Sequence, residues 1–348
     1  MATDPIATAA AGGLAAAATR LGRSSVTVTP LGFGGASIGN LYKQVSDDEA
    51  AAVVDAAWHA GIRYFDTAPH YGLGRSEQRL GATLRRLPRA SYTVSTKVGR
   101  LLVPSPGNAG HRDPGGFDVP AAHRRVWNFT SAGVRRSLLE SLDRLGLERI
   151  DLALIHDPEE GNPVTAVEQA YPALHELRAA GVVGAIGVGS KQWQILARFV
   201  ADTDLDVVML AGRYTLLEQP ALDHLLPACA TRGVSVLNVG VFNSGLLAVD
   251  DPSTAGHYEY GAAPAELVAR AGQIAAVCRR HGSTLPAAAL AFAGAHPAVA
   301  SVVLGSGSVR HLTHNVERWA TPPPAQLWAE LVDSGLLRPD APVPAATQ

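Results

Sequence analysis

Short apolar runs alternate along the chain with longer amphipathic segments. Eight of these runs are continuous rather than alternating, which is typical of strands that are buried on both faces of a parallel sheet. The segments between them have the length and spacing of helices that cover such a sheet. The strands are predicted at residues 31–35, 62–66, 92–97, 150–155, 183–188, 206–210, 234–239 and 300–304.

The helices follow the strands in turn, and the first of them has clear start signals. Ser46 is placed to cap it, and three acidic residues follow in its first turn. Eight strand-and-helix units without a break in composition favour one domain, and eight such units close more readily into a barrel than into an open sheet. We therefore predict a (β/α)8 TIM barrel. The helices are predicted at residues 47–60, 76–86, 130–145, 164–180, 192–201, 220–232, 264–281, 285–295, 309–319 and 325–334.

Two stretches, 99–128 and 242–262, are too long for plain connections. We expect them to be functional loops at the C-terminal face of the barrel, where sites of this fold lie. An Ala-rich flexible tail is predicted for residues 1–24, the barrel domain for 25–336 and a second flexible tail for 337–348.

Composition narrows the class of partner. The 348 residues are 47% hydrophobic and 17% charged, with a formal net charge of −2, which argues against nucleic acid or an anionic membrane surface. No apolar run approaches the ~20 residues of a membrane-spanning helix. The two cysteines, Cys229 and Cys278, are spaced too far apart for a metal motif and are expected as buried thiols, so we predict no metal site and a cytoplasmic location.

Four polar residues stand at or just after the ends of three successive strands: Asp66, Tyr71, Lys97 and His156. Neighbouring strands of a barrel bring such residues to one mouth. A nearby ammonium favours the phenolate form of a tyrosine, so Lys97 would lower the pKa of Tyr71, Asp66 would pair with Lys97, and His156 would orient a reacting oxygen. Singly, each residue also fits a structural role, as a cap, a packing group or a surface side chain. Together they indicate a proton donor or acceptor suited to hydride transfer.

The same residues lie in segments that resemble a known family. Residues 65–77, Phe-Asp-Thr-Ala-Pro-His-Tyr-Gly-Leu-Gly-Arg-Ser-Glu, are similar to the signature of the aldo-keto reductases, as are 96–99 and 141–156. The resemblance runs from about residue 26 to residue 319. It implies a TIM barrel, a nicotinamide cofactor bound without a Rossmann fold, and a catalytic tetrad of Asp66, Tyr71, Lys97 and His156.

Cofactor contacts are expected around the mouth of the barrel. The glycine-rich run at 32–39 is not a Rossmann fingerprint, because Ser37 stands where the third glycine is needed, so Gly34 and Gly35 are read as a first loop near the nicotinamide or the substrate, or as a tight turn. A second small-residue run precedes a helix and would form an anion seat, or serve as a helix cap with a flexible turn. Its residues are Gly305, Ser306, Gly307 and Ser308.

The resemblance adds further cofactor residues. Gly305 and His311 stand where members that use NADP often carry cations, so we expect NAD to be preferred over NADP, with Arg310 as a partial replacement. Ser190 would contact the carboxamide and Asn315 the adenine. A loop over the pyrophosphate would include Asn243, Ser244, Gly245 and Leu247.

Trp127 and Asn128 close the first long loop and are the candidate substrate contacts, although Trp127 also fits a packing role. Residues 97–102, 156–158 and 211–219 resemble a branch of the family that oxidises aldoses, which implies oxidation of a C1 hemiacetal to a lactone, with a small sugar or aldehyde as the partner. Three alternatives stay open: an NADPH-linked aldehyde or ketone reductase, a dehydrogenase of pyridoxal, and a cofactor-sensing regulatory subunit. The sugar, the direction and the oligomeric state are left undetermined.

Overall fold

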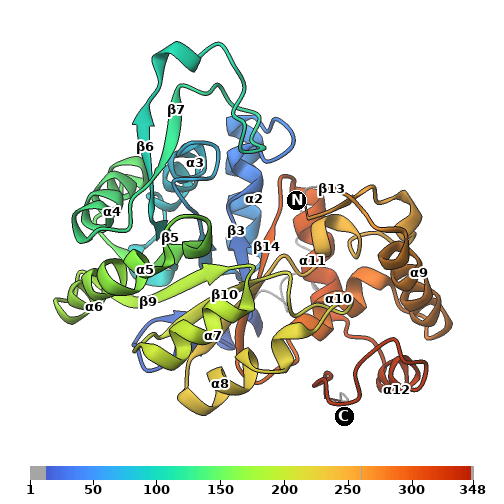
Figure 1. Cartoon of the computed structure of the whole chain (residues 1–348). Coiled ribbons are helices and arrows are strands. Elements are labelled where there is room, and N and C mark those ends of the chain that lie inside the picture. The colour runs from blue at the N-terminus through green and yellow to red at the C-terminus, as the bar shows by residue number, and fades with distance from the viewer. Residues whose placement is uncertain (1–12, 260, 346–348) are drawn as a thin grey trace.

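The computed structural model describes residues 13–259 and 261–345, and within them eight parallel strands close into a barrel (Figure 1). The predicted (β/α)8 fold is confirmed. Around the barrel the strands lie in sequence order, and β14 closes the ring against β3. They are β3 (Leu31–Gly34), β4 (Tyr64–Asp66), β5 (Thr93–Val98), β8 (Ile150–His156), β9 (Val183–Ser190), β10 (Val207–Ala211), β11 (Ser235–Val239) and β14 (Val299–Gly305).

Helices surround the strands, and the predicted caps hold them in place. Ser46 caps α2 and forms a reciprocal capping box with Glu49. One predicted helix is interrupted: residues 164–180 include a π-helical turn at Ala166–Ala170. The main helices are α2 (Asp47–His59), α3 (Arg75–Leu84), α4 (Ser131–Leu145), α6 (Tyr171–Ala179), α7 (Trp193–Asp202), α8 (Leu225–Arg232), α9 (Ala265–Arg280), α10 (Leu285–Ala293), α11 (Val309–Ala320) and α12 (Ala325–Asp333).

The base of the barrel is closed by a short hairpin of β1 (Thr19–Arg20) and β2 (Thr27–Val28). Leu21, in its turn, is fully buried and belongs to the same apolar cluster as the inward-facing strand residues. The tail predicted for 1–24 is therefore wrong over its last part, because Leu21 needs a buried partner surface; residues 1–12 lie outside the described part of the chain. The remaining members of the cluster are Val26, Val28, Tyr64, Leu152, Leu154, Ala185, Val207, Met209, Leu237, Ala300 and Val303.

The predicted C-terminal tail also packs on the barrel. Leu337 and Ala341 are buried, and Arg338 pairs with Asp223, with 2.6 Å between Nη1 and Oδ1. The apolar side chains anchor this segment, and the prediction of a flexible tail is wrong as far as residue 345. Residues 346–348 lie outside the described part.

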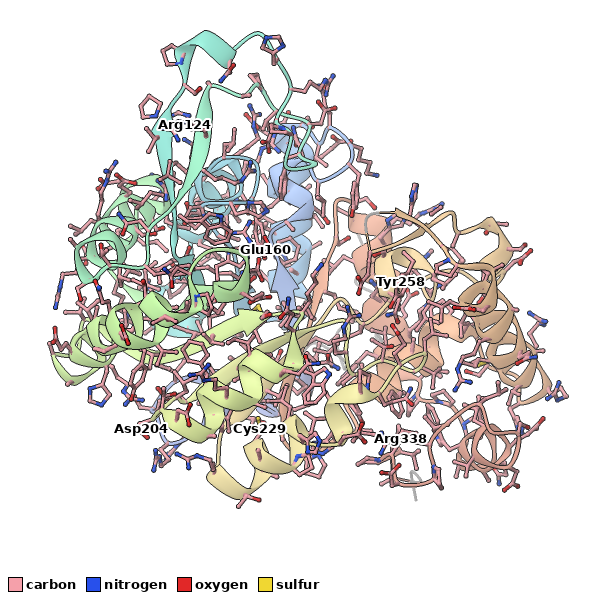
Figure 2. All side chains as sticks on the ribbon, in the orientation of Figure 1. Arg124, Glu160, Asp204, Cys229, Tyr258 and Arg338 are labelled. Atoms are coloured by element: carbon pink, nitrogen blue, oxygen red, sulfur yellow. The ribbon has the colours of Figure 1, made fainter. Side chains whose placement is uncertain are left out.

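The first long loop contains an antiparallel hairpin, β6 (Arg100–Pro104) with β7 (His123–Trp127), which projects beyond the barrel, with Arg124 far out on it (Figures 1 and 2). The expectation of an irregular stretch missed this pairing, because the two halves are far apart in sequence. The segment between the strands folds back: Leu41 pairs with Phe117, and Tyr42 N–H donates to Gly116 O at 3.1 Å. Two loops thus join to form a roof at one side of the barrel mouth.

Candidate active site

The structure brings the four predicted residues together at the mouth of the barrel. Asp66 ends β4, Lys97 lies near the end of β5 and His156 ends β8, and these strands are parallel neighbours. Tyr71 lies in the turn after β4, and its N–H donates to Ala68 O at 3.1 Å. A glycine must follow, because a Cβ at position 72 would lie 2.2 Å from the carbonyl oxygen of Gly39. This close approach explains the Tyr-Gly pair of the signature.

A buried ion pair forms the centre of the site. Lys97 Nζ lies 2.6 Å from Asp66 Oδ2, and the two side chains are 2% and 5% exposed. Lys97 also donates to Thr67 O at 3.0 Å, and Ser95 Oγ donates to Asp66 Oδ1 at 2.7 Å. The carboxylate is therefore bound on both oxygens, and the ammonium is fixed in one position. Such a pair is costly to desolvate and is stable only when both partners are present.

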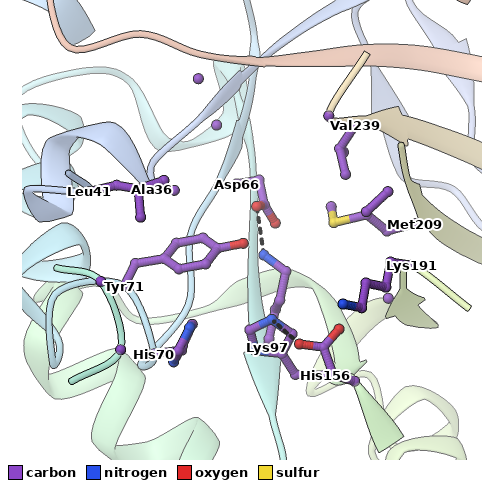
Figure 3. A pocket seen from close by; sticks show the side chains of 18 of the residues that line it. Ala36, Leu41, Asp66, His70, Tyr71, Lys97, His156, Lys191, Met209 and Val239 are labelled. Atoms are coloured by element: carbon purple, nitrogen blue, oxygen red, sulfur yellow. Dashed lines mark hydrogen bonds and ion pairs between the residues drawn. The ribbon is translucent and has the colours of Figure 1, made fainter. Parts of the chain in front are cut away.

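The Tyr71 hydroxyl points toward the Lys97 ammonium (Figure 3), and Lys97 Nζ lies 4.6 Å from the centre of the Tyr71 ring. Burial raises the pKa of Tyr71 above its ordinary value, although Lys97 pulls it down by its charge and by a hydrogen bond. The predicted influence of Lys97 thus has the right direction, but the expectation of a net lowering is wrong for this site. Desolvation of the phenolate outweighs the single ammonium, so Tyr71 is a neutral phenol.

The other two titrating groups have well-defined charges. Burial alone would lower the pKa of Lys97, but the Asp66 carboxylate and Tyr71 more than offset this and raise it, so Lys97 is charged. Burial, together with the nearby Arg100 and Lys97, lowers the pKa of His156 well below its usual range. His156 is therefore neutral, and its ring lies edge-on to Tyr71 with 6.0 Å between ring centres. A neutral imidazole beside a phenol can orient an oxygen without adding charge.

A cavity of about 720 Å³ opens onto these four side chains. Of the predicted cofactor residues, Gly34, Ser190 and Gly305 line it as well. The apolar part of its lining includes Leu41, Met209 and Val239, which lie around the tetrad in Figure 3. A concave site that combines apolar walls with a few fixed polar groups is suited to a small organic ligand.

Several charged pocket residues were not among the predicted site residues. Arg100 pairs with Asp157 and with Glu160, whose Oε2 lies 3.2 Å from Arg100 Nη2. His70 also lines the cavity, and burial, with Arg100 and Arg125 nearby, lowers its pKa to about 2. The available signal was position: Arg100 and Asp157 stand three residues and one residue after Lys97 and His156, on the same strand ends.

The structure does not bring Trp127 and Asn128 to the cavity lining. Trp127 stacks on Phe129 with 5.6 Å between ring centres, and Arg100 lies 4.2 Å from a Trp127 ring centre. Asn128 Oδ1 accepts from both N–H and Oγ of Thr130, at 3.1 and 2.6 Å. Trp127 therefore supports Arg100 from behind, and Asn128 serves the turn before α4.

The small-residue run before α11 has the geometry of an anion seat. Ser308 caps the helix, accepting from His311 N–H at 3.3 Å, and Ser306 Oγ donates to Ser308 O at 2.9 Å. A Cβ at Gly307 would lie 3.8 Å from the Lys43 side chain. The positive groups Lys43, Arg310, His314 and Arg318 all act on His311 and, after burial, lower its pKa further. Helix N–H groups and cations thus surround this turn, which is the environment that a phosphate prefers.

The remaining predicted cofactor residues lie on other loops. Asn243 is buried, and its Oδ1 has no hydrogen-bond partner within the described residues, while its Nδ2 donates to Glu218 at 3.3 Å. An orphaned buried oxygen fits a position that a ligand completes. Leu247 and Asn315 are buried, Ser244 Oγ accepts from Glu259 N–H, Gly245 has a positive φ, and Gly35 packs against Ser76. These residues and the anion seat together fit a nicotinamide dinucleotide.

Metal-binding and membrane-spanning features are both missing from the described residues. Across 13–259 and 261–345, no group of three or more His, Cys, Asp or Glu side chains is arranged to hold a metal ion. Within the same ranges, no helix is both long enough and apolar enough to cross a membrane.

The chain belongs to the aldo/keto reductase family, whose model matches residues 30–334. It is therefore an oxidoreductase of a family that works with nicotinamide cofactors. Among curated relatives, it is 51% identical over 320 residues to D-threo-aldose 1-dehydrogenase of a Pseudomonas species, covering 90% of this chain and 96% of the relative. It is 38% identical to pyridoxal 4-dehydrogenase of Microbacterium luteolum, covering 91% and 97%.

Solved structures show the same fold. The holo form of an aldo-keto reductase from Bacillus halodurans matches with a TM-score of 0.70 and 25% identity, covering 92% of this chain and 96% of that one. A glycerol dehydrogenase from Gluconobacter oxydans matches with a TM-score of 0.71 and 21% identity, covering 96% and 99%.

Proposed function

We propose that this protein oxidises the C1 hemiacetal of an aldose to a lactone with a nicotinamide cofactor. The observation that carries the proposal is the buried Lys97–Asp66 pair beside Tyr71 and His156, in a chain that is 51% identical to a D-threo-aldose 1-dehydrogenase. When bound, the oxidised nicotinamide supplies the hydride acceptor and a positive charge. Its presence fits the cavity that joins the tetrad to Gly34, Ser190 and Gly305.

Tyr71 is the proton acceptor in this proposal. Oxidation of a hemiacetal hydroxyl must release a proton, and the Tyr71 oxygen is the group that the fixed Lys97 ammonium can stabilise as a phenolate. Burial raises the pKa of Tyr71. A further positive charge in the pocket would offset this, so the phenolate form is favoured when oxidised cofactor is present. In the opposite direction the neutral phenol is already a suitable acid.

His156 orients the reacting oxygen, and Asp66 fixes Lys97. His156 is neutral, so its N–H can donate to the oxygen on C1 without competing with Lys97 for the phenolate. Asp66 holds Lys97 Nζ at 2.6 Å, which keeps the ammonium in register with Tyr71. The roles are therefore divided: Tyr71 moves the proton, Lys97 sets its affinity, and the other two residues hold the geometry.

NAD is the cofactor that we propose to be preferred over NADP. Gly305 offers no cation, and His311 is kept neutral by burial and by its positive neighbours, so neither adds charge for a 2′-phosphate. Lys43 and Arg310 lie in the same region and can reach an anion, which makes the preference one of degree. We also propose a cytoplasmic location, which the two buried free thiols, Cys229 and Cys278, support.

A panel of substrates tests the proposal. The enzyme would be incubated with NAD or NADP and with L-fucose, D-arabinose, L-galactose or pyridoxal, with reduced cofactor followed by absorbance and the product identified by NMR. We expect reduced cofactor and lactone in equal amounts with at least one aldose. Oxidation of pyridoxal alone would favour the second candidate, which the 38% identical pyridoxal 4-dehydrogenase supports. Tight cofactor binding without turnover would favour a regulatory role instead.

A further inference from the structure

Asp157 occupies an unusual position beside the tetrad. It directly follows His156 at the end of β8, its backbone adopts φ 40° and ψ 60°, and its N–H donates to Gly189 O at 2.9 Å. This left-handed conformation is uncommon outside glycine, although aspartate tolerates it better than most residues. The side chain lines the cavity. The local backbone thus holds a carboxylate at the site at a small conformational cost.

The carboxylate lies between His156 and a guanidinium. Asp157 Oδ2 is 3.4 Å from His156 Nε2 and also forms an ion pair with Arg100. Arg100 is 7% exposed, its Nη1 lies 3.3 Å from His70 Nδ1, and its Nε has no hydrogen-bond partner within the described residues. Because Trp127 backs the guanidinium at 4.2 Å, Arg100 and Asp157 form a fixed polar wall of the cavity.

The proton transfer described above does not use this wall. The Lys97 charge is already balanced by Asp66, and the phenol of Tyr71 faces Lys97 rather than Arg100. A carboxylate in a half-buried cavity loses hydration, and this loss is offset only where it accepts hydrogen bonds. A plain aldehyde has no donor to offer it. A sugar does, because each carbon next to C1 carries either a hydroxyl or the ring oxygen, and only the hydroxyl can donate.

We propose that Asp157 is a specificity-determining residue that accepts a hydrogen bond from the C2 hydroxyl of the aldose. The inference rests on the proposed function, in which the oxygen on C1 lies within hydrogen-bond reach of His156 Nε2. A carboxylate oxygen 3.4 Å from that nitrogen is then beside the neighbouring carbon of the substrate. Arg100 holds the carboxylate in place. The site therefore selects substrates with a hydroxyl next to the reacting carbon.

A double comparison tests this contact. D-arabinose and its 2-deoxy form would be compared as substrates of the wild-type enzyme and of Asp157→Asn, which keeps the shape of the side chain and removes its charge. We expect the wild type to favour D-arabinose in kcat/KM by about 10- to 100-fold, the range for a hydrogen bond to a charged group. In Asp157→Asn this preference should fall to within about threefold, because the variant has lost the acceptor that the hydroxyl needs.

The matched control is Glu160→Gln. Glu160 pairs with the same guanidinium at 3.2 Å but is 47% exposed and is not in contact with His156. We expect it to retain most of the preference for D-arabinose. A preference that is unchanged in Asp157→Asn, with the wild type active on D-arabinose, would overturn the role of Asp157 alone. An equal loss of preference in both variants would also overturn it, and assign the effect to Arg100. A wild type that oxidises no aldose would instead overturn the proposed function.

Discussion

The two halves of the barrel mouth are built by different means. Around β4, β5 and β8, charged and polar side chains arise from strand ends and bind one another, as in the Lys97–Asp66 pair at 2.6 Å. Around α11 and residues 243–247, glycines, hydroxyls and helix N–H groups dominate, and the cations are supplied by neighbouring loops. The comparison teaches that proton transfer needs side chains fixed in a low-dielectric interior, whereas a phosphate can be held by backbone and by charges near the surface.

The largest effect is expected from Tyr71→Phe, which removes one oxygen from the side-chain half. Turnover should fall by about 10²- to 10⁴-fold, because no other group near Lys97 can exchange the proton. Cofactor affinity, measured by fluorescence titration, should change little, since the phosphate seat lies in the other half. Turnover within a fewfold of the wild type would remove Tyr71 from the mechanism.

Asp66→Asn should reduce stability strongly. Removing one partner of a buried ion pair leaves Lys97 uncompensated, and we expect the free energy of unfolding to fall by about 3 to 5 kcal/mol in urea denaturation. Glu176→Gln is the control, because Glu176 forms an exposed pair with Arg135 and should cost less than about 1 kcal/mol. Similar costs for the two variants would mean that the central pair is not a structural requirement.

The pH dependence tests the polar wall. Burial raises the pKa of Asp157 to about 6, although Arg100 opposes this. An acid is charged above its pKa, so the acceptor is present at pH 7 and mostly lost at pH 5. We expect kcat/KM for an aldose to fall about tenfold over that interval, and Asp157→Asn to lack the step. The charged or titratable groups facing Asp157 are Arg100, Lys97, His156, Glu159 and Glu160.

The smallest effect is expected in the loop half. Combining Gly305→Lys with His311→Arg adds two cations near the anion seat, and the ratio of kcat/KM for NADP over NAD should rise about fivefold or more. Ser37 must shift slightly, since a Cβ at position 305 would lie 3.2 Å from its Oγ. An unchanged ratio would indicate that Lys43 or Arg310 already decides the preference.

The same contrast explains what could be predicted from the sequence. Strand ends fix the direction of their side chains, so the apolar runs before Asp66, Lys97 and His156 were enough to anticipate that these groups meet. The fold followed from the regular alternation of runs and helices. Residues on long loops had no such constraint: Trp127 and Asn128 stand near the end of a hairpin whose pairing depends on contacts over more than twenty residues.

Two further differences arise from packing that no local pattern reveals. Leu21 and Leu337 stand in segments that look like tails, yet each finds an apolar surface on the completed barrel. The pKa of Tyr71 depends on how deeply the phenol is buried, which the sequence does not state, so the charge of Lys97 was given too much weight. Asp157 was adjacent to a predicted residue but was read only as part of a motif.

The most direct test of the central claim follows the hydride itself. The enzyme would be incubated with NAD and an aldose deuterated at C1, and the reduced cofactor and the product would be examined by NMR and mass spectrometry. The proposed function predicts deuterium on the reduced nicotinamide, a lactone that has lost it, and slower turnover than with the unlabelled sugar. Reduced nicotinamide without deuterium, or no oxidation of any aldose, would contradict it.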